Sequence, residues 1–117
     1  MIRKNSEYST KQMSALCGGK GDALREELFA PNEFEGKHVI VCTRMTLAPG
    51  AVCGAHPHDK EDEVYYILSG HGEVTEGDNA PVAVGPGDST LTGHGLSHAI
   101  ACTGDEPLVF LAVIVTC

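Results

Sequence analysis

Two histidines and a glutamate lie close together in the segment GAVCGAHPHDKEDEVYYILSG, which spans residues 50–70. His56 and His58 are one residue apart, and residues i and i+2 of a β-strand point to the same face, so both imidazoles can converge on one point. Glu63 follows a short polar loop, at the head of the next apolar run. An antiparallel neighbouring strand would place its carboxylate beside the histidine pair. The segment therefore predicts three metal ligands from two adjacent strands.

A fourth ligand is expected from a later strand. His98 lies in the segment GLSHAIAC, where it shares a face with Ile100 and Cys102. Three neutral imidazoles and one carboxylate suit divalent transition metals, and we favour Mn or Fe over Zn, Ni, Co or Cu. Four protein ligands on an octahedral ion leave two positions for water or substrate, which is the open arrangement that metal catalysis needs.

Two further residues are candidates for proton transfer. Tyr65 shares the face of Glu63 and is expected to point inward, where its phenol would bind a ligand or act as acid or base. The alternative is a core tyrosine whose hydroxyl finds a structural partner. His94, between two glycines, is a candidate proton shuttle near the mouth of the site, and the alternative is a solvated loop histidine.

Three more residues are candidates for lining the pocket: Cys53, Cys102 and Arg44. For both cysteines the alternative is a small buried thiol without a chemical role. Arg44 could clamp a carboxylate bidentately if its side of the strand faces inward. We favour the outward arrangement, in which it contributes solvent-exposed charge.

The elements that would position these residues are short strands. The segment 37–50 alternates, with residues 39, 41, 43, 45 and 47 on one face, and segment 63–70 alternates in the same way. The 14 glycines and 6 prolines supply frequent turns. About eight strands follow one another at the spacing typical of an all-β sandwich or barrel. Residues 22–29 could form either a helical turn from Asp22 to Phe29 or an irregular edge strand.

Composition limits the classes of function. A chain of 117 residues is expected to form one domain. The formal net charge of −8 would repel a phosphate backbone, so we do not expect nucleic acid as a partner. No apolar run approaches the length needed to span a bilayer, and no signal peptide is recognised, so we expect a cytoplasmic protein. An odd count of five cysteines and the lack of a recognised secretory signal argue against a disulfide framework.

The chain resembles the cupin superfamily through two motifs between residues 50 and 102. The first motif is matched at every position by Gly50, His56, His58, Glu63 and Gly70. The second is matched in spacing by Gly87, Gly93, Gly95, His98 and Cys102. Gly93 replaces the usual proline and Cys102 the usual asparagine. The resemblance implies a double-stranded antiparallel β-barrel, or jelly roll, with a barrel core over residues 38–116 and an N-terminal arm over 1–37. It also implies His56, His58, Glu63 and His98 as metal ligands, and a homodimer.

Within the cupins, the chain is similar to small single-domain proteins of the oxalate-decarboxylase-like group. Oxalate-degrading cupins place an arginine three residues before the first histidine, and this chain has Cys53 there. We therefore expect a metal-dependent enzyme acting on a small oxygen-rich substrate, a carboxylate or an enolisable carbonyl, by decarboxylation, dioxygenation or isomerisation. The alternative is a non-catalytic module that binds a small ligand. A metal-independent sugar isomerase or epimerase is disfavoured by the intact ligand set.

Overall fold

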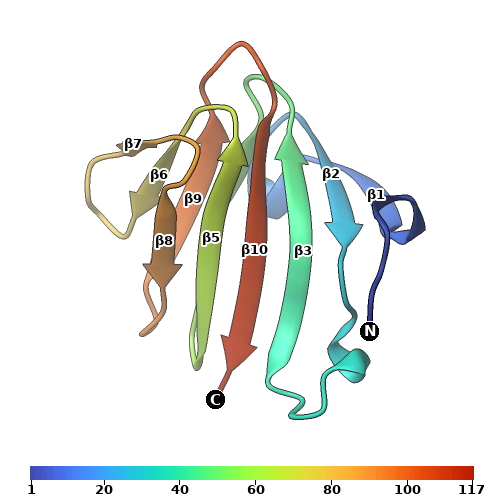
Figure 1. Cartoon of the computed structure of the whole chain (residues 1–117). Coiled ribbons are helices and arrows are strands. Elements are labelled where there is room, and N and C mark those ends of the chain that lie inside the picture. Colours follow the sequence, from blue (N-terminus) through green and yellow to red (C-terminus); the bar gives the residue numbers. More distant parts are fainter.

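Ten β-strands form two antiparallel sheets in the computed structural model, which describes residues 1–117 (Figure 1). The six-stranded sheet runs in the order β1 (Ser9–Ser14), β2 (Asp22–Glu27), β3 (Val39–Leu47), β10 (Leu108–Thr116), β5 (Glu61–Ser69), β8 (Ser89–Thr92). The four-stranded sheet runs in the order β4 (Val52–Pro57), β9 (Ser97–Cys102), β6 (Gly72–Glu76), β7 (Val82–Val84). Three 3-10 turns complete the chain: η1 (Asn5–Glu7), η2 (Leu16–Gly18) and η3 (Pro31–Glu33). The chain contains no helix with the length and apolar character needed to cross a membrane.

The two sheets pack face to face around one core. Ile67 and Phe110 from the larger sheet join Val74 and Ile100 from the smaller sheet in a single buried cluster. Fully burying one such side chain stabilises the folded state by about 1.5–3 kcal/mol, so this contact between the sheets contributes substantially to stability. The predicted all-β jelly roll is confirmed.

Strand alternation decides which side chains reach the interior. In β3 the buried residues are Thr43, Met45 and Leu47, which confirms the predicted inward face. In β5 the residues Glu63, Tyr65 and Ile67 are buried, while the residues between them are exposed. A charged residue and a tyrosine thus lie on the inward face of the strand, where apolar residues are usual. This indicates a binding site inside the barrel.

The N-terminal segment contributes two strands to the larger sheet, so the chain has ten strands rather than about eight. Residues 22–27 form β2, and the helical alternative for this segment is wrong. Strand β2 is not an edge strand, because it pairs with β3 on one side and with β1 on the other. Its pairing with β3 explains the outcome, since backbone hydrogen bonds to a neighbouring strand override weak local helix propensity.

Strands β4 and β5 lie in different sheets, which corrects the prediction that they are neighbours. Strand β4 pairs with β9, whereas β5 lies between β10 and β8. The chain crosses from one sheet to the other within residues 58–60, where Lys60 adopts a left-handed φ of 59°. The histidine pair and Glu63 therefore meet across the barrel interior and not side by side within one sheet.

Candidate metal centre

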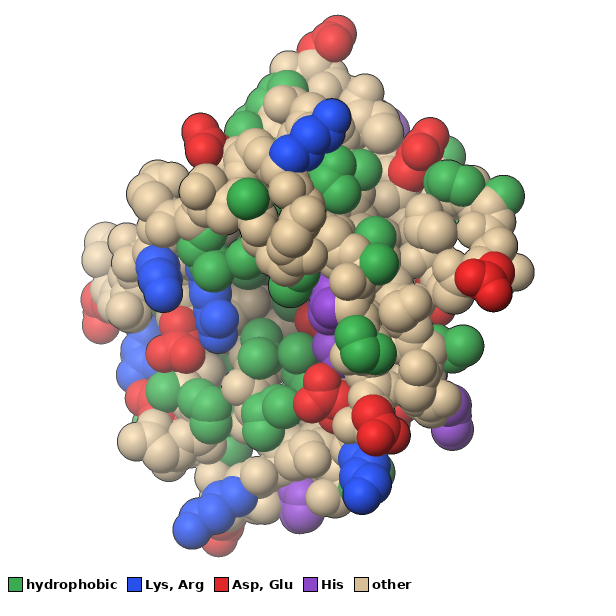
Figure 2. All heavy atoms as spheres, turned by 180° about the vertical axis from the view of Figure 1, so that it is seen from behind, with side chains coloured by type: hydrophobic (Ala, Val, Ile, Leu, Met, Phe, Trp, Pro, Cys, Tyr) green, Lys and Arg blue, Asp and Glu red, His purple; other side chains and the backbone are tan.

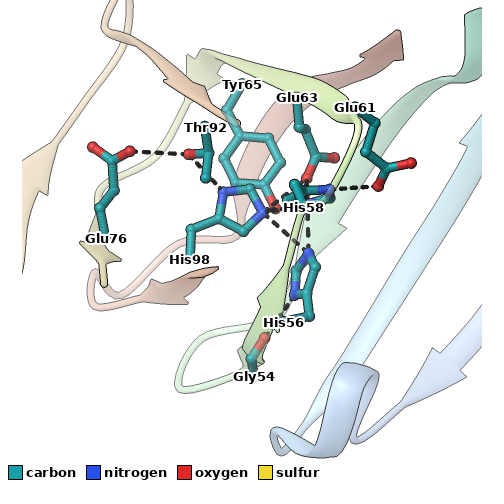
Figure 3. A network of polar contacts seen from close by, with 9 residues as sticks. All are labelled: Gly54, His56, His58, Glu61, Glu63, Tyr65, Glu76, Thr92 and His98. Atoms are coloured by element: carbon teal, nitrogen blue, oxygen red, sulfur yellow. Dashed lines mark hydrogen bonds and ion pairs between the residues drawn. The ribbon is translucent and has the colours of Figure 1, made fainter. Parts of the chain in front are cut away.

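Four predicted ligands converge in the interior of the barrel (Figure 3). His56 lies on β4, His58 directly follows that strand, Glu63 is near the start of β5, and His98 is on β9. His56 and His98 are paired in register across β4 and β9, so their side chains project to the same side. All four residues are buried except His56, which is half-buried. Their donor atoms lie within 4.8 Å of one another.

The four donor atoms are spaced like neighbouring corners of a coordination shell. Nε2 of His98 lies 2.9 Å from Nε2 of His58 and 3.0 Å from Nε2 of His56. Oε1 of Glu63 lies 2.7 Å from Nε2 of His58 and 2.8 Å from Nε2 of His98, but 3.7 Å from Nε2 of His56. Two metal–nitrogen bonds of about 2.1 Å at a right angle place their nitrogens about 3.0 Å apart. Four of these five separations match neighbouring donors around one divalent ion, and the separation between Glu63 and His56 is wider.

The outer nitrogens of the first two histidines are held by hydrogen-bond acceptors. Nδ1 of His56 lies 2.8 Å from the carbonyl oxygen of Gly54. Nδ1 of His58 lies 2.7 Å from Oε1 of Glu61. An acceptor at Nδ1 keeps the proton on that nitrogen, so the lone pair of Nε2 points to the centre and is available to a metal.

A chain of hydrogen bonds between the two sheets orients His98. Thr92 Oγ1 on β8 donates to Oε2 of Glu76 on β6, at 3.0 Å. Its lone pairs are then free to accept from Nδ1 of His98, also at 3.0 Å. Thr92 and His98 are both fully buried, so water cannot replace this contact. The threonine thus fixes the same tautomer in the third imidazole.

The charges of the centre favour a cation. Burial alone would raise the pKa of Glu63, but hydrogen bonds from His56 and His98 lower it to about 2. Hydrogen bonds to Cys53 and then to Glu63 raise the pKa of His56 to about 11. The lowered pKa of Glu63 means that its carboxylate is ionised, and together with Cys53 it favours positive charge at this point. A metal cation meets that demand by replacing a proton.

Tyr65 borders the centre, as its alternation with Glu63 predicts. Its ring stacks on the imidazole of His98 with centroids 4.8 Å apart and planes at 13°. Its hydroxyl lies 3.2 Å from Nε2 of His98. Burial, followed by the negative charge of Glu63, raises the pKa of the phenol. The hydroxyl is therefore protonated at neutral pH and can donate a hydrogen bond into the site.

A cavity of about 150 Å³ opens beside the centre. Figure 2 shows that part of the surface, where histidine side chains lie in a hollow among hydrophobic side chains. His56, Glu63 and Tyr65 form its polar wall, and its apolar wall includes Met45 and Phe110. The cavity is large enough for a small ligand that contacts the centre. A larger open hollow of about 540 Å³ between β6, β7 and β8 contains none of the four ligands.

The predicted pocket residues separate into two groups. Cys53 lines the cavity and is 4 % exposed, as predicted. Cys102 is buried near the opposite end of β9, where its thiol donates to the carbonyl of Glu106, so it is not part of the cavity. Arg44 faces outward and forms a salt bridge with Glu26, with an Nη2–Oε2 distance of 2.8 Å.

His94 lies in the exposed loop between β8 and β9 and does not line the cavity. It adopts a left-handed φ of 57°, which places it at the tip of a tight turn. The loop is attached to the site through its neighbour, because the amide of Gly95 donates to the carbonyl of His58 at 2.8 Å. The structure thus places the loop near the ligands and the imidazole of His94 on the surface.

A β-bulge brings Cys53 and His56 to the same side of β4. Residues three apart on a regular strand face opposite ways. Cys53 pairs with Ile100 and His56 pairs with His98, so β4 uses three steps where β9 uses two. The extra residue reverses the alternation, and both side chains point into the cavity.

Among the cavity residues with a polar, charged or thiol group, three were not predicted as part of the site: Cys17, Arg25 and Thr43. Arg25 comes from β2 and forms none of the salt bridges of the chain. Thr43 is 1 % exposed, and its hydroxyl has no hydrogen-bond partner. The inward position of Thr43 could have been predicted from the alternation of β3. No local pattern marked Arg25 or Cys17.

Comparisons with known proteins identify the family of the chain. The model of the cupin domain matches residues 43–114. An oxalate-binding protein of Thermotoga maritima is 37% identical over 115 residues, which cover 98% of this chain and 93% of that protein. A crystal structure of a predicted oxalate decarboxylase from Thermotoga maritima superimposes with a TM-score of 0.94 at 35% identity, covering 100% of both chains. A glucose-6-phosphate isomerase of Thermococcus kodakarensis is 29% identical over 106 residues, 80% of this chain and 56% of the relative.

The family match covers more than half of the chain and includes all four ligands of the centre. The Thermotoga maritima crystal structure has the same fold over the whole length of this chain. The chain belongs to the cupin family.

Proposed function

We propose that this cupin is a metal-dependent enzyme that acts on a small carboxylate, with Mn or Fe as the favoured metal. His56, His58, Glu63 and His98 would hold the ion. When bound, such an ion supplies a Lewis acid to which substrate oxygens can bind. The observation that carries the proposal is Arg25, a guanidinium without an acidic partner in the wall of the same cavity.

The position of Arg25 follows from the register of β2. Arg25 pairs with Met45, and Met45 points into the core, so Arg25 points to the interior as well. The next residue, Glu26, pairs with Arg44 on the outer face and forms a salt bridge with it there. A guanidinium can bind both oxygens of a carboxylate at once, and this contact is stronger where water is partly excluded. We therefore assign Arg25 to the substrate carboxylate.

Two hydroxyl groups complete the polar surface of the cavity. The hydroxyl of Thr43 is buried without a partner, so it is available to a ligand oxygen. The protonated phenol of Tyr65 lies next to His98 and can donate a hydrogen bond to a negative charge that develops on the substrate. The apolar wall, which includes Met45 and Phe110, excludes water from the reacting carboxylate.

Oxalate is the first ligand to test, because the Thermotoga maritima relative is named for binding it. Protein loaded with Mn²⁺ is titrated with oxalate and with longer dicarboxylates in a calorimeter. Arg25→Gln should weaken binding by on the order of 10- to 100-fold, and Arg44→Gln, a change on the outer face, should leave it unchanged. Equal affinity of the Arg25→Gln protein and the unaltered protein would refute the assignment.

A turnover assay separates the enzyme from a non-catalytic binding module. Carbon dioxide release, oxygen uptake and loss of the carboxylate are followed with Mn²⁺, Fe²⁺, Ni²⁺ and Zn²⁺. The proposal expects turnover with at least one ion, and Tyr65→Phe should reduce kcat more than it changes binding. Tight carboxylate binding without turnover would favour the non-catalytic binding module. This alternative is supported by the Thermotoga maritima relative, which is named as an oxalate-binding protein.

We also propose that two copies of the chain form a homodimer through the outer face of β5 and β8. Val64, Tyr66, Leu68 and Leu91 are exposed there, and an apolar patch of this kind is typical of a protein contact. Light scattering should give the mass of a dimer, and Tyr66→Glu should give a monomer. Leu96→Glu, in an exposed loop elsewhere, is the control. A monomer for the unaltered chain at micromolar concentration would contradict the proposal.

A further inference from the structure

Two thiols and an imidazole form a second cluster at the side of the cavity. The sulfur atoms of Cys17 and Cys53 and one nitrogen of His56 lie within 4.8 Å of one another. Cys53 is buried on β4, whereas Cys17 is exposed on η2, so the cluster extends from the interior to the surface. All three residues line the cavity beside the metal centre. The proposed carboxylate chemistry uses neither thiol.

The fold brings Cys17 against β4 by a close approach of two backbones. The amide of Lys20 donates to the carbonyl of Val52 at 3.1 Å, and the amide of Val52 donates to the carbonyl of Lys20 at 2.8 Å. Any Cβ at Gly54 would collide with the carbonyl oxygen of Cys17, and any Cβ at Gly19 would collide with that of Val52. Glycine at both places is therefore required for this contact.

The backbone of Cys17 is itself held in an uncommon conformation. Its φ is 50°, in the left-handed region that few residues other than glycine adopt. The 3-10 turn around it is closed by a hydrogen bond of 2.9 Å from the Gly19 amide to the Leu16 carbonyl. The turn and the two glycines together place the Cys17 thiol beside Cys53. Cys42 and Cys117 belong to no such cluster of ligand atoms.

We propose that Cys17, Cys53 and His56 form a second metal site, which binds a soft, thiophilic cation of the Zn²⁺ and Cd²⁺ class. Two thiolates and one imidazole are a ligand set that zinc accepts, with a fourth position for water or another ligand. Sulfur ligands select this class of ion over Mn²⁺, which prefers oxygen and nitrogen ligands. The exposure of Cys17 gives the ion a path from solvent.

The two sites share His56 and therefore exclude each other. Nδ1 of His56 is bonded to the carbonyl of Gly54, so Nε2 is the nitrogen that remains for a metal. That lone pair can serve one ion at a time. A thiophilic cation on the two cysteines would thus take a ligand from the centre formed with His58, Glu63 and His98, and it would also obstruct the cavity.

The first experiment titrates reduced, metal-free protein with Cd²⁺ and follows the ultraviolet absorption of cadmium–thiolate bonds. The unaltered chain should show the band, and Cys17→Ser and Cys53→Ser should each weaken Cd²⁺ binding at the thiols by on the order of 100-fold. Cys117→Ser, at an exposed cysteine, and Cys42→Ser, at a half-buried one, are matched controls that should retain the band. A band of equal strength in Cys17→Ser protein would overturn the proposal. Because Cys17 is exposed, its substitution tests the site even where Cys53→Ser disturbs folding, which circular dichroism would show.

A second experiment tests the sharing of His56. Protein loaded with Mn²⁺ is mixed with Cd²⁺, and release of free Mn²⁺ is followed by electron paramagnetic resonance. Release should need on the order of 100-fold more Cd²⁺ in the Cys17→Ser protein than in the unaltered chain. Equal release from both would show that Cd²⁺ enters the centre directly, and the shared site would be wrong. Neither readout uses a carboxylate ligand, so failure here is distinct from failure of the proposed function.

Discussion

Replacing the hydroxyl of Thr92 by a methyl group should weaken metal binding although all four metal ligands are kept. Thr92 accepts a hydrogen bond from Nδ1 of His98 at 3.0 Å and donates one to Glu76 at 3.0 Å. Thr92→Val has nearly the same shape, so packing is kept while the acceptor is lost. Nδ1 of His98 is then a buried donor without a partner, and Nε2 is no longer held as the metal-binding nitrogen.

The size of the effect follows from this geometry. Removing a group that orients a metal-binding histidine costs about 10- to 100-fold in metal affinity, which corresponds to about 1.4–2.7 kcal/mol. The unpaired donor should also lower the free energy of unfolding of the metal-free protein by about 1–3 kcal/mol. Calorimetric titration with Mn²⁺ measures the first quantity, and urea unfolding in the presence of a chelator measures the second.

Thr90 provides a matched control on the same strand. Its hydroxyl oxygen is buried without a hydrogen-bond partner, so Thr90→Val removes an unsatisfied group. That change should leave metal affinity unaltered and should be neutral or stabilising for the fold. Equal affinity of the Thr92→Val protein and the unaltered chain for Mn²⁺ would refute the role of the Thr92 hydroxyl. An equal loss of affinity in the Thr90→Val protein would refute it as well, because the cause would then be a general disturbance of β8.

Three further changes test the packing, the close approach and the charges. Phe110→Ala should cost about 3–5 kcal/mol in urea unfolding, because the ring is 2 % exposed and packs edge-on against Tyr65; a loss below about 1 kcal/mol would contradict this. Gly54→Ala should destabilise the fold by about 1–3 kcal/mol and abolish the cadmium–thiolate band, since its methyl group collides with the Cys17 carbonyl. A hydrogen bond from Arg3 lowers the pKa of Glu33 from its ordinary value of 4.5 to about 2. The ionised carboxylate therefore stabilises the fold above pH 4.5, and this contribution is lost as the pH falls through about 2. Glu33→Gln should therefore flatten that part of an acid-unfolding curve, and an unchanged curve would exclude the pair as a contributor.

The ligands could be predicted from sequence because their geometry is mostly local. The spacing of His56 and His58 fixes a common face, and alternation places Glu63 and Tyr65 together on β5. The sheet to which each strand belongs is not a local property. A three-residue connection between β4 and β5 is typical of a hairpin, and the same length also lets the chain cross between two packed sheets. The prediction of adjacent strands failed for that reason, although the ligands still meet.

Arg25 was missed because its inward orientation runs against the hydrophobic pattern of its strand. In the segment DALREE, an inward Leu24 would place Arg25 outside. The observed register does the opposite, since Leu24 pairs with Thr46 and Arg25 pairs with the buried Met45. Patterning rules assume that the inner face is apolar, and a ligand cavity is the place where that assumption fails.

Cys53 connects the two proposals that this cavity supports. In the oxalate-degrading cupins that the chain resembles, its position carries the arginine that holds the carboxylate. We propose that Arg25 on the opposite sheet takes this role here, and the position on β4 carries a thiol within 4.8 Å of that of Cys17. A guanidinium on one wall binds a carboxylate, and two thiolates on the opposite wall bind a soft cation. Arg25→Gln should therefore impair only carboxylate binding, and Cys17→Ser should impair only the binding of the soft cation. The two variants thus separate the two proposed sites, although His56 belongs to both.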